Sequence, residues 1–268
     1  MITVVDKFID WAHSQLKEND DAQAYLWGRG ISEFQWDRHR LGYVDGQFDC
    51  DPSTDFRHNE SCENRDLKAQ WCDTCRYRSW SSLWEDNGSG WKDRKIGARI
   101  SGGVVFPLTS YSGANVGFQV RSISQKVFDT FTLKERPEGY FFGINKAISK
   151  IWETKEIWLT EGPGDALLVE RFAVENVVAL TTSSLSKHQM RFLDRFVSTV
   201  YLCLDMDKAG REGAAYFKRH NAEKFEIHDV KYAYPGLTLD DNKDVGNIWK
   251  KIGDEKFGLH MKRILDRK

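Results

Sequence analysis

Two aspartates follow an apolar run in the stretch LCLDMDKAG, which covers residues 202–210. The run from Val200 to Leu204 is typical of a buried strand, and a helical pattern begins at Gly210. Asp205 and Asp207 are therefore expected at the end of a strand. An aspartate at such a place is often only a helix N-cap, so the pair by itself is weak evidence for a site.

A second acidic group occurs earlier, in a similar position. The apolar stretch EIWLT, residues 156–160, is followed by Glu161 and Gly162, and Asp165 opens the next helical pattern. Beyond residue 155 the patterns alternate, with strands expected at 156–160, 177–180, 199–204 and 225–234. Helices are expected at 165–172, 187–196 and 210–220. Such alternation indicates a parallel sheet flanked by helices.

The topology predicts that Glu161, Asp165, Asp205 and Asp207 meet at one edge of this sheet. Ligands of open α/β sheets bind outside the carboxyl ends of the strands. Clustered carboxylates repel one another unless a cation neutralises them, and oxygen ligands suit Mg²⁺ or Mn²⁺. A cation of this kind is used in phosphoryl or nucleotidyl transfer.

The first half of the chain has a different organisation. Helices are expected at 3–17, 21–27 and 33–38, and two β runs at 99–110 and 113–123 are joined by a turn at Ser112 and Gly113. Residues 140–150 are expected to be helical, whereas residues 44–95 show no clear period. The fold class is therefore α/β, an α+β N-terminal part followed by a parallel sheet. We expect an N-terminal subdomain at 1–150 with an insertion at 44–95, a catalytic domain at 151–236, and a C-terminal segment at 237–268.

Several stretches, taken in order, resemble one family. LTEGPGDALLVE (159–170) and LCLDMDKAGREGA (202–214) are similar to the TOPRIM domain of primases, topoisomerases and some nucleases. YLWGRGISEFQWDRHRLGY (25–43), RISGGVVFPLTSYSGANVGFQVRSI (99–123), YFFGINKAI (140–148), TSSLSKHQMRFL (182–193) and KDVGNIW (243–249) resemble blocks of DnaG-type primases. The ordered set resembles the catalytic core of a DnaG-type, phage-like DNA primase.

This resemblance implies roles for particular residues. Glu161 would act as a general base on the attacking 3′-hydroxyl or as a metal ligand that orients it, and Asp205 and Asp207 would hold Mg²⁺ or Mn²⁺. Asp165 and Asp244 would be supporting ligands. Arg99, Arg121 and Lys146 would contact nucleotide or DNA, Lys126 and Lys134 stay undecided, and Arg29 would be structural.

Four of the five cysteines, Cys50, Cys62, Cys72 and Cys75, lie in the irregular insertion. Cys72 and Cys75 have the spacing of half a zinc site, and His58 could replace a more distant cysteine as ligand. We expect zinc here, with free thiols as the alternative. Cys203 lies in the apolar strand and is expected to be a buried small residue.

The composition limits the partners. The formal net charge is −1, so binding of a nucleic acid needs a local basic surface. We find no membrane-length apolar run, no leader peptide and no Walker-type phosphate loop, and expect a cytoplasmic protein, in a bacterial host cell if phage-encoded. The expected partners are a single-stranded DNA template, nucleoside triphosphates, a separate helicase and a separate zinc-ribbon protein. A metal-dependent TOPRIM nuclease and a non-catalytic nucleic-acid-binding module are the alternative functions.

Overall fold

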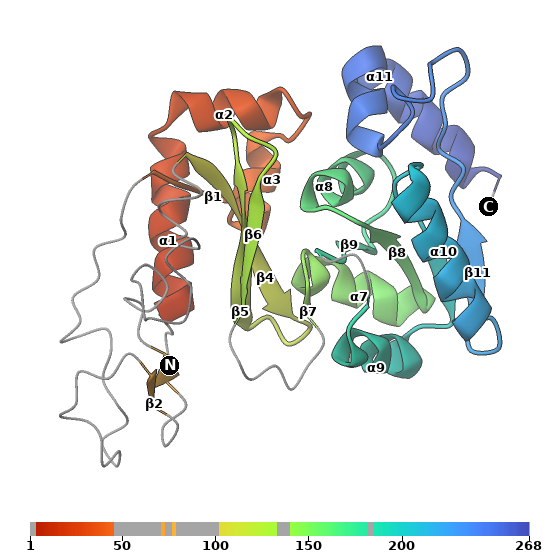
Figure 1. The fold of residues 1–268 in the computed structure, drawn as a ribbon, viewed down its shortest axis with the longest axis horizontal. Coiled ribbons are helices and arrows are strands. Elements are labelled where there is room, and N and C mark those ends of the chain that lie inside the picture. The colour runs from red at the N-terminus through yellow and green to blue at the C-terminus, as the bar shows by residue number, and fades with distance from the viewer. Residues whose placement is uncertain are drawn as a thin grey trace. The chain divides into compact units, whose positions relative to one another are not determined.

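The computed structural model describes residues 4–45, 102–132, 140–181 and 185–267, together with the backbone of 71–72 and 77–78. The chain divides into two compact units (Figure 1). The first consists of residues 1–22, 40–105 and 119–129, and the second of residues 23–39, 106–118 and 130–268. The sequence-based domain limits at 150 and 236 stay a prediction. In the described residues, no helix is both long enough and apolar enough to cross a membrane.

The first unit is built on α1 (Val4–Lys17) and β1 (Gly42–Val44). Helix α1 buries Val5, Phe8, Ala12 and Leu16, whose spacing of three or four residues places them on one face. This face packs against β1. Strand β1 pairs antiparallel with the start of β4 (Gly103–Ser110).

β4 belongs to a sheet with the strand order β1-β4-β5-β6, in which β7 also pairs with β4. The further strands are β5 (Asn115–Ser122), β6 (Phe128–Thr132) and β7 (Tyr140–Phe141). The turn expected at Ser112 and Gly113 is present, and the Ser110 amide donates to the Ala114 carbonyl at its base. A separate pair of short strands, β2 (Trp71–Cys72) and β3 (Tyr77–Arg78), is antiparallel.

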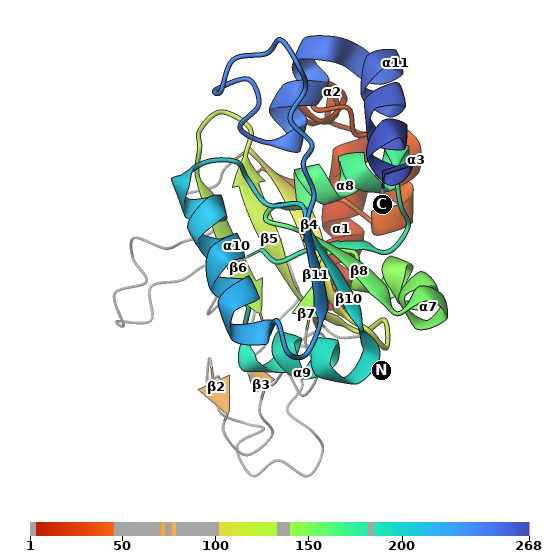
Figure 2. The same cartoon turned by 90° about the vertical axis from the view of Figure 1, so that its right-hand side faces the viewer.

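The second unit contains the parallel sheet that the alternating pattern predicts. Its strand order is β11-β10-β8-β9, and every pairing is parallel. The strands are β8 (Glu156–Thr160), β9 (Val177–Ala179), β10 (Thr199–Leu202) and β11 (Glu226–Asp229). Figure 2 shows β8, β10 and β11 next to one another.

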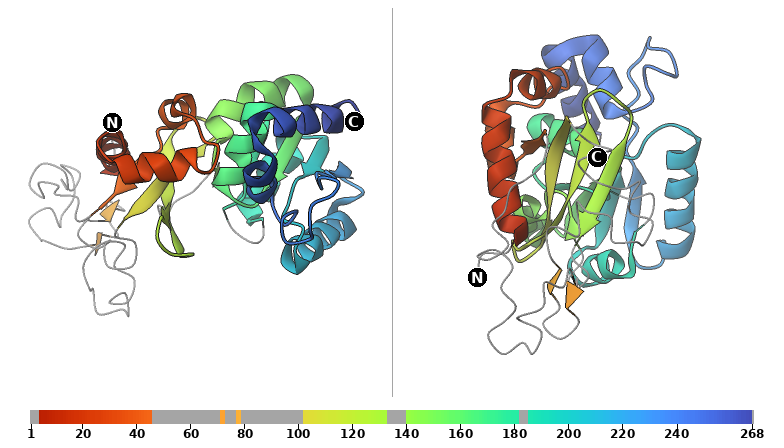
Figure 3. Two further views of the ribbon diagram at one scale, coloured as in Figure 1. Left: turned by 90° about the horizontal axis from the view of Figure 1, so that it is seen from above. Right: turned by 60° about the vertical axis from the view of Figure 1, so that its left-hand side comes forward.

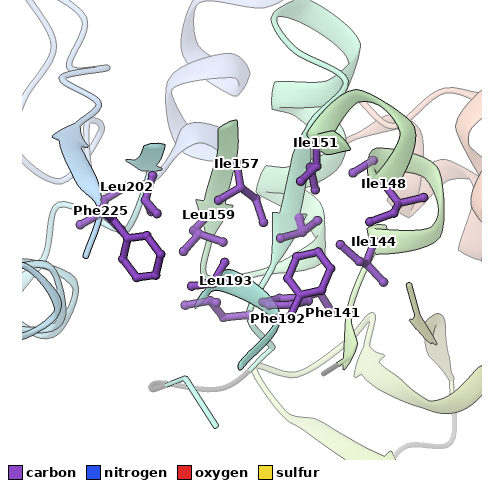
Figure 4. Close-up of a cluster of buried hydrophobic side chains, with 14 of the residues drawn as sticks. Phe141, Ile144, Ile148, Ile151, Ile157, Leu159, Phe192, Leu193, Leu202 and Phe225 are labelled. Carbon is purple, nitrogen blue, oxygen red and sulfur yellow. The ribbon is translucent and has the colours of Figure 1, made fainter. Parts of the chain in front are cut away.

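In the described residues, five helices accompany this sheet. They are α7 (Ile144–Thr154), α8 (Pro163–Phe172), α9 (Lys187–Phe196), α10 (Lys208–Asn221) and α11 (Val245–Leu265). Helix α11 packs on α8. One sheet face, with Ile157, Leu159 and Leu202, packs against apolar residues of α7 and α9 such as Ile151 and Phe192 (Figure 4). Burial of such side chains contributes about 1.5–3 kcal/mol each, so this cluster is a main stabilising element.

The opposite face of the sheet carries a row of stacked rings. Trp158 stacks on Tyr201 with 5.0 Å between ring centroids, and Tyr201 stacks on His228 at the same separation. Helices α8 and α11 contribute no residue to the cluster on the first face and pack against each other. Figure 3 shows α11 in two parts that point in different directions. The change of direction is at Gly253, which has φ 75° and ψ 174°.

The short helices α2 (Asp20–Trp27) and α3 (Glu33–His39) also agree with the sequence-based expectation. Within the second unit, α3 is attached to α8 by polar contacts. The Gln35 side chain donates to the Leu167 carbonyl at 2.6 Å, and Arg38 and His39 both contact the Glu170 carboxylate. Burial alone would raise the pKa of Glu170, but the contacts with His39 and Arg38 outweigh it and hold this pKa below its ordinary value.

Two expectations about secondary structure were wrong in part, and one helix was not predicted. The last strand ends at Asp229, because the following residues turn out of the sheet and the Tyr232 hydroxyl donates to the Leu204 carbonyl at 2.7 Å. The stretch expected to be helical from residue 140 begins instead as β7. Helix α11 was not predicted, because Gly246, Gly253 and Gly258 interrupt its helical pattern.

Gly30, in the RGI element, occupies a place that a larger residue does not fit. Its φ is +75°, and a Cβ atom there would lie 2.5 Å from the Trp249 ring and 2.8 Å from Leu168. The neighbouring Arg29 guanidinium lies over the Tyr25 ring at 4.7 Å, which supports a structural role for Arg29.

Replacing Gly30 by alanine is expected to lower the free energy of unfolding by about 2–4 kcal/mol, from left-handed backbone strain and overpacking. Urea unfolding measures this change. The matched control is Gly213→Ala, since Gly213 lies in α10 and a Cβ atom added there would meet nothing within 4 Å. The control should keep or slightly raise stability, and equal stability of both variants would contradict the packing described for Gly30.

Candidate active site

The carboxyl edge of the parallel sheet carries the acidic residues that the sequence predicts there. Glu161 follows β8, and Asp205 and Asp207 follow β10. Asp165 lies in the first turn of α8, and Asp244 is the N-cap of α11. Electrostatic coupling of Asp205 to the other four carboxylates shows that all five side chains lie near one another. We call these five residues the acidic cluster.

Close backbone packing positions the part of the cluster after β10. A Cβ atom on Gly210 would lie 2.1 Å from the Asp205 carbonyl oxygen and 2.7 Å from Glu161 Oε1, so only glycine fits. The Gly210 amide donates to Asp207 Oδ1 at 3.0 Å, which makes Asp207 the N-cap of α10. The Asp205 amide donates to Glu161 Oε1 at 3.2 Å and joins the two strand ends.

The remaining two carboxylates are joined through α11. Asp244 Oδ1 accepts from the Asn247 amide at 2.6 Å, and Asp165 Oδ1 accepts from the Gly246 amide at 3.0 Å. The start of α11 is thereby held against the start of α8, which brings Asp244 to the sheet edge.

The loop before Asp244 has a defined shape because Asn242 holds it. The Asn242 side-chain amide donates to the carbonyls of Tyr234, Leu237 and Thr238, and its oxygen accepts from the Tyr234 amide at 2.7 Å. The Met206 amide then donates to the Lys243 carbonyl at 2.7 Å. These bonds fix residue 243 beside the loop that carries Asp205 and Asp207.

Sequence reasoning assigned no role to Lys243, although it is part of the KDVGNIW block. Its ammonium group lies 3.2 Å from Asp207 Oδ2. The position of Lys243 directly before Asp244 could have indicated a role in the site.

The charges of the cluster shift the pKa values of its members in different directions. Burial, followed by repulsion from Asp165, Glu161, Asp244 and Asp207, raises the pKa of Asp205 to about 8. Burial also raises the pKa of Glu161, despite the hydrogen bond from the Asp205 amide. The Gly210 amide, together with Lys243, lowers the pKa of Asp207. In the described residues the Asp205 carboxylate accepts no hydrogen bond, so it is the least compensated charge of the cluster.

The cluster fits a divalent cation in donor type and in charge. All five side chains offer oxygen ligands, the kind preferred by Mg²⁺ and Mn²⁺, and a bound cation would relieve the repulsion at Asp205. A finished coordination sphere is not present, because no three acidic, histidine or cysteine side chains of the described residues are close enough to hold a metal as they stand. Several of the carboxylates instead accept hydrogen bonds from backbone amides.

The other predicted site residues are not brought into this cluster. Arg121 lies on β5 in the first unit, and Lys146 lies on α7 in the second; both side chains are partly exposed. Cys203 is buried, as expected. Arg99, Lys134, His58, Cys50, Cys62 and Cys75 lie outside the described residues, as does the side chain of Cys72, so the zinc site stays a prediction.

Comparison with known proteins agrees with this geometry. Residues 158–245 match a family model described as Toprim-like, so the acidic cluster lies in a Toprim-type domain. The DNA primase of Buchnera aphidicola is 24% identical over 172 residues, which cover 63% of this chain and 29% of that primase. The chain thus spans about three tenths of the length of this relative.

Solved structures extend the likeness to nearly the whole chain. The zinc-binding and RNA polymerase domains of Aquifex aeolicus primase superpose with a TM-score of 0.67 and 22% identity, covering 98% of this chain and 59% of that structure. A DnaG primase catalytic domain bound to single-stranded DNA gives a TM-score of 0.61 and 19% identity, covering 97% of this chain and 79% of that one. The chain therefore has the fold of DnaG-type primase catalytic domains, and residues 158–245 form its Toprim-like part.

The raised pKa of Asp205 predicts how stability depends on pH without added metal. A carboxyl whose pKa is higher in the folded state, about 8 against an ordinary 3.8, binds its proton more tightly when folded. Stability therefore falls as pH rises between about 4 and 8. Asp205→Asn removes this penalty and should raise the free energy of unfolding at pH 8.5 by about 2–4 kcal/mol, with little gain at pH 4.

Urea unfolding between pH 4 and 8.5, with a chelator present, measures this difference. Asp194→Asn is the matched control, since Asp194 is on the exposed side of α9 and pairs with Lys224 at 3.0 Å. If the free energy of unfolding of Asp205→Asn and of wild type changed with pH in parallel, the Asp205 carboxylate would not destabilise the fold at high pH.

Proposed function

We propose that this chain is a primase catalytic core, which makes short RNA primers on a single-stranded DNA template by metal-dependent nucleotidyl transfer. The proposal rests on the position of Asp205. Its carboxylate is largely buried and lies among four others at the carboxyl edge of a Toprim-like sheet. Such an arrangement is costly without a cation, and an oxygen-rich cation site matches the needs of a triphosphate. The DnaG-type fold favours primer synthesis over other Toprim reactions.

In this proposal the acidic cluster holds one or two divalent cations, Mg²⁺ or Mn²⁺. Toprim domains in general depend on Mg²⁺. The ions would neutralise the incoming triphosphate and the developing charge on pyrophosphate. Asp205 and Asp207 are the main ligands, and Asp165 and Asp244 support them from α8 and α11.

Glu161 has the properties of the proton acceptor. Its pKa is raised by burial, which makes it a better base than an exposed carboxylate, and the Asp205 amide orients it. The 3′-hydroxyl oxygen of the growing primer bonds to the α-phosphorus while the bond to pyrophosphate breaks. The hydroxyl proton passes to Glu161; the alternative is that Glu161 orients the hydroxyl as a metal ligand.

The other partners are part of the same proposal. Arg99, Arg121 and Lys146 contact template or nucleotide phosphates, and the solved catalytic domain bound to single-stranded DNA supports a template of that kind. The proposal also includes a zinc ion bound by Cys50, Cys62, Cys72 and Cys75. It includes a separate helicase, a separate zinc-ribbon protein and a phage origin of the chain.

The test is incubation of the chain with mixed-sequence single-stranded DNA, labelled ribonucleotides and Mg²⁺ or Mn²⁺. Wild type should yield short labelled products, and Asp205→Asn should lower the rate by at least about 100-fold, since the charge that acts on the transition state is lost. The matched control Asp194→Asn removes a similar charge on the same domain and should keep wild-type activity.

The same reactions separate the alternatives. Shortening of the DNA without nucleotides, lost in Asp205→Asn, would assign the site to a Toprim nuclease. DNA binding without either reaction, unchanged in Asp205→Asn, would favour a non-catalytic nucleic-acid-binding module.

A further inference from the structure

The chain itself places a cation beside the acidic cluster. Lys243 Nζ lies 3.2 Å from Asp207 Oδ2. The two residues are far apart in the sequence, and the hydrogen bond from the Met206 amide to the Lys243 carbonyl brings their backbones together. The ion pair is therefore a result of the folded loop and not of local sequence.

This ion pair occupies the oxygen of Asp207 that a metal would need. Asp207 Oδ1 accepts from the Gly210 amide as the N-cap of α10, and Oδ2 faces the Lys243 ammonium. Both carboxylate oxygens thus have partners within the protein. The helix cap depends on α10 itself, whereas the contact with Lys243 is a charged hydrogen bond from a flexible side chain.

Lys243 can leave this position without disturbing the fold. Its backbone is fixed, but its side chain is 47% exposed, and the Asp207 side chain is 36% exposed. Exposed ion pairs of this type contribute at most about 1 kcal/mol, less than a divalent cation gains among several carboxylates. An ammonium group and a metal ion on one oxygen would also repel each other.

We infer that Lys243 is a tethered counter-ion of the metal-free site, which a divalent cation must displace from Asp207 before this carboxylate becomes a ligand. The ammonium group lowers the charge of the acidic cluster while no metal is bound. It also competes with the metal for Asp207, so binding requires a higher metal concentration. The inference rests on the metal site of the proposed function but does not require primer synthesis.

Removing the ammonium group is expected to strengthen metal binding. Titration with Mn²⁺, followed by the electron paramagnetic resonance signal of the free ion, gives the dissociation constant without any catalytic assay. Lys243→Met should lower this constant roughly threefold to tenfold, since a competitor and a repelling charge are both lost. Lys243→Arg keeps a cation and should bind no more tightly than wild type.

Lys251→Met is the matched control. Lys251 pairs with Asp241 at 2.9 Å, is exposed to a similar degree, and belongs to the same C-terminal segment. Its loss changes the net charge equally, so its Mn²⁺ affinity should stay at the wild-type value. Unchanged or weaker binding in Lys243→Met, or equal tightening in both methionine variants, would overturn the inference.

A second measurement uses the wild-type protein and does not depend on a folded variant. Amine-reactive labelling read by mass spectrometry should modify Lys243 faster after Mg²⁺ is added, because its ammonium group has left Asp207, while Lys251 stays unchanged. An unchanged or slower rate at Lys243 would overturn the inference. If wild type bound no Mn²⁺, the metal site itself would be overturned. If wild type bound Mn²⁺ and Lys243→Met bound it equally well, only the role of Lys243 would be overturned.

Discussion

The carboxylate of Asp205 is the charge on which the organisation of the site depends. It is partly buried, it lies near Glu161, Asp165, Asp207 and Asp244, and in the described residues it accepts no hydrogen bond. The protein stabilises its neighbours with backbone amides, notably those of Gly210 and Gly246, but leaves Asp205 without such a donor. An uncompensated carboxylate is costly to keep, and this cost is removed when a cation binds. This is why the proposed function assigns the site a positively charged ligand.

The fold meets this requirement by bringing three distant segments to one sheet edge. The parallel pairing of β8 and β10 places Glu161 beside Asp205, and the tight approach at Gly210 holds the second strand end close to Glu161. Helix α11 completes the cluster, because its N-terminal amides bind Asp165 and Asp244. The bonds from the Asp205 amide to Glu161 and from the Gly246 amide to Asp165 each position a carboxylate and join two elements, so the site and the local fold share these contacts. Lys243 belongs to this arrangement as the cation supplied by the chain itself.

The positions of Glu161, Asp165, Asp205 and Asp207 could be predicted from sequence because they depend on period and topology alone. Asp244 could be assigned only through resemblance to a family, since its place depends on a loop closed by the Asn242 side chain, which has no periodic signature. For the same reason Lys243 received no role. Strand β11 was predicted to reach Tyr234 because apolar residues resume at Val230 and Tyr232 after Asp229, but the Tyr232 hydroxyl binds the Leu204 carbonyl instead. The interpretation of the cysteines concerns side chains outside the described residues, and it stays a prediction.

Anomalous X-ray diffraction from crystals of the chain soaked in Mn²⁺ would show directly where a divalent cation binds. A manganese peak should appear bonded to the carboxylates of Asp205 and Asp207, with the Lys243 ammonium group moved away from Asp207. Saturating Mn²⁺ without a peak at the acidic cluster would contradict the assignment of this sheet edge as the catalytic metal site. A peak bonded to Asp205, with Lys243 still paired to Asp207, would retain the metal site but contradict the role given to Lys243.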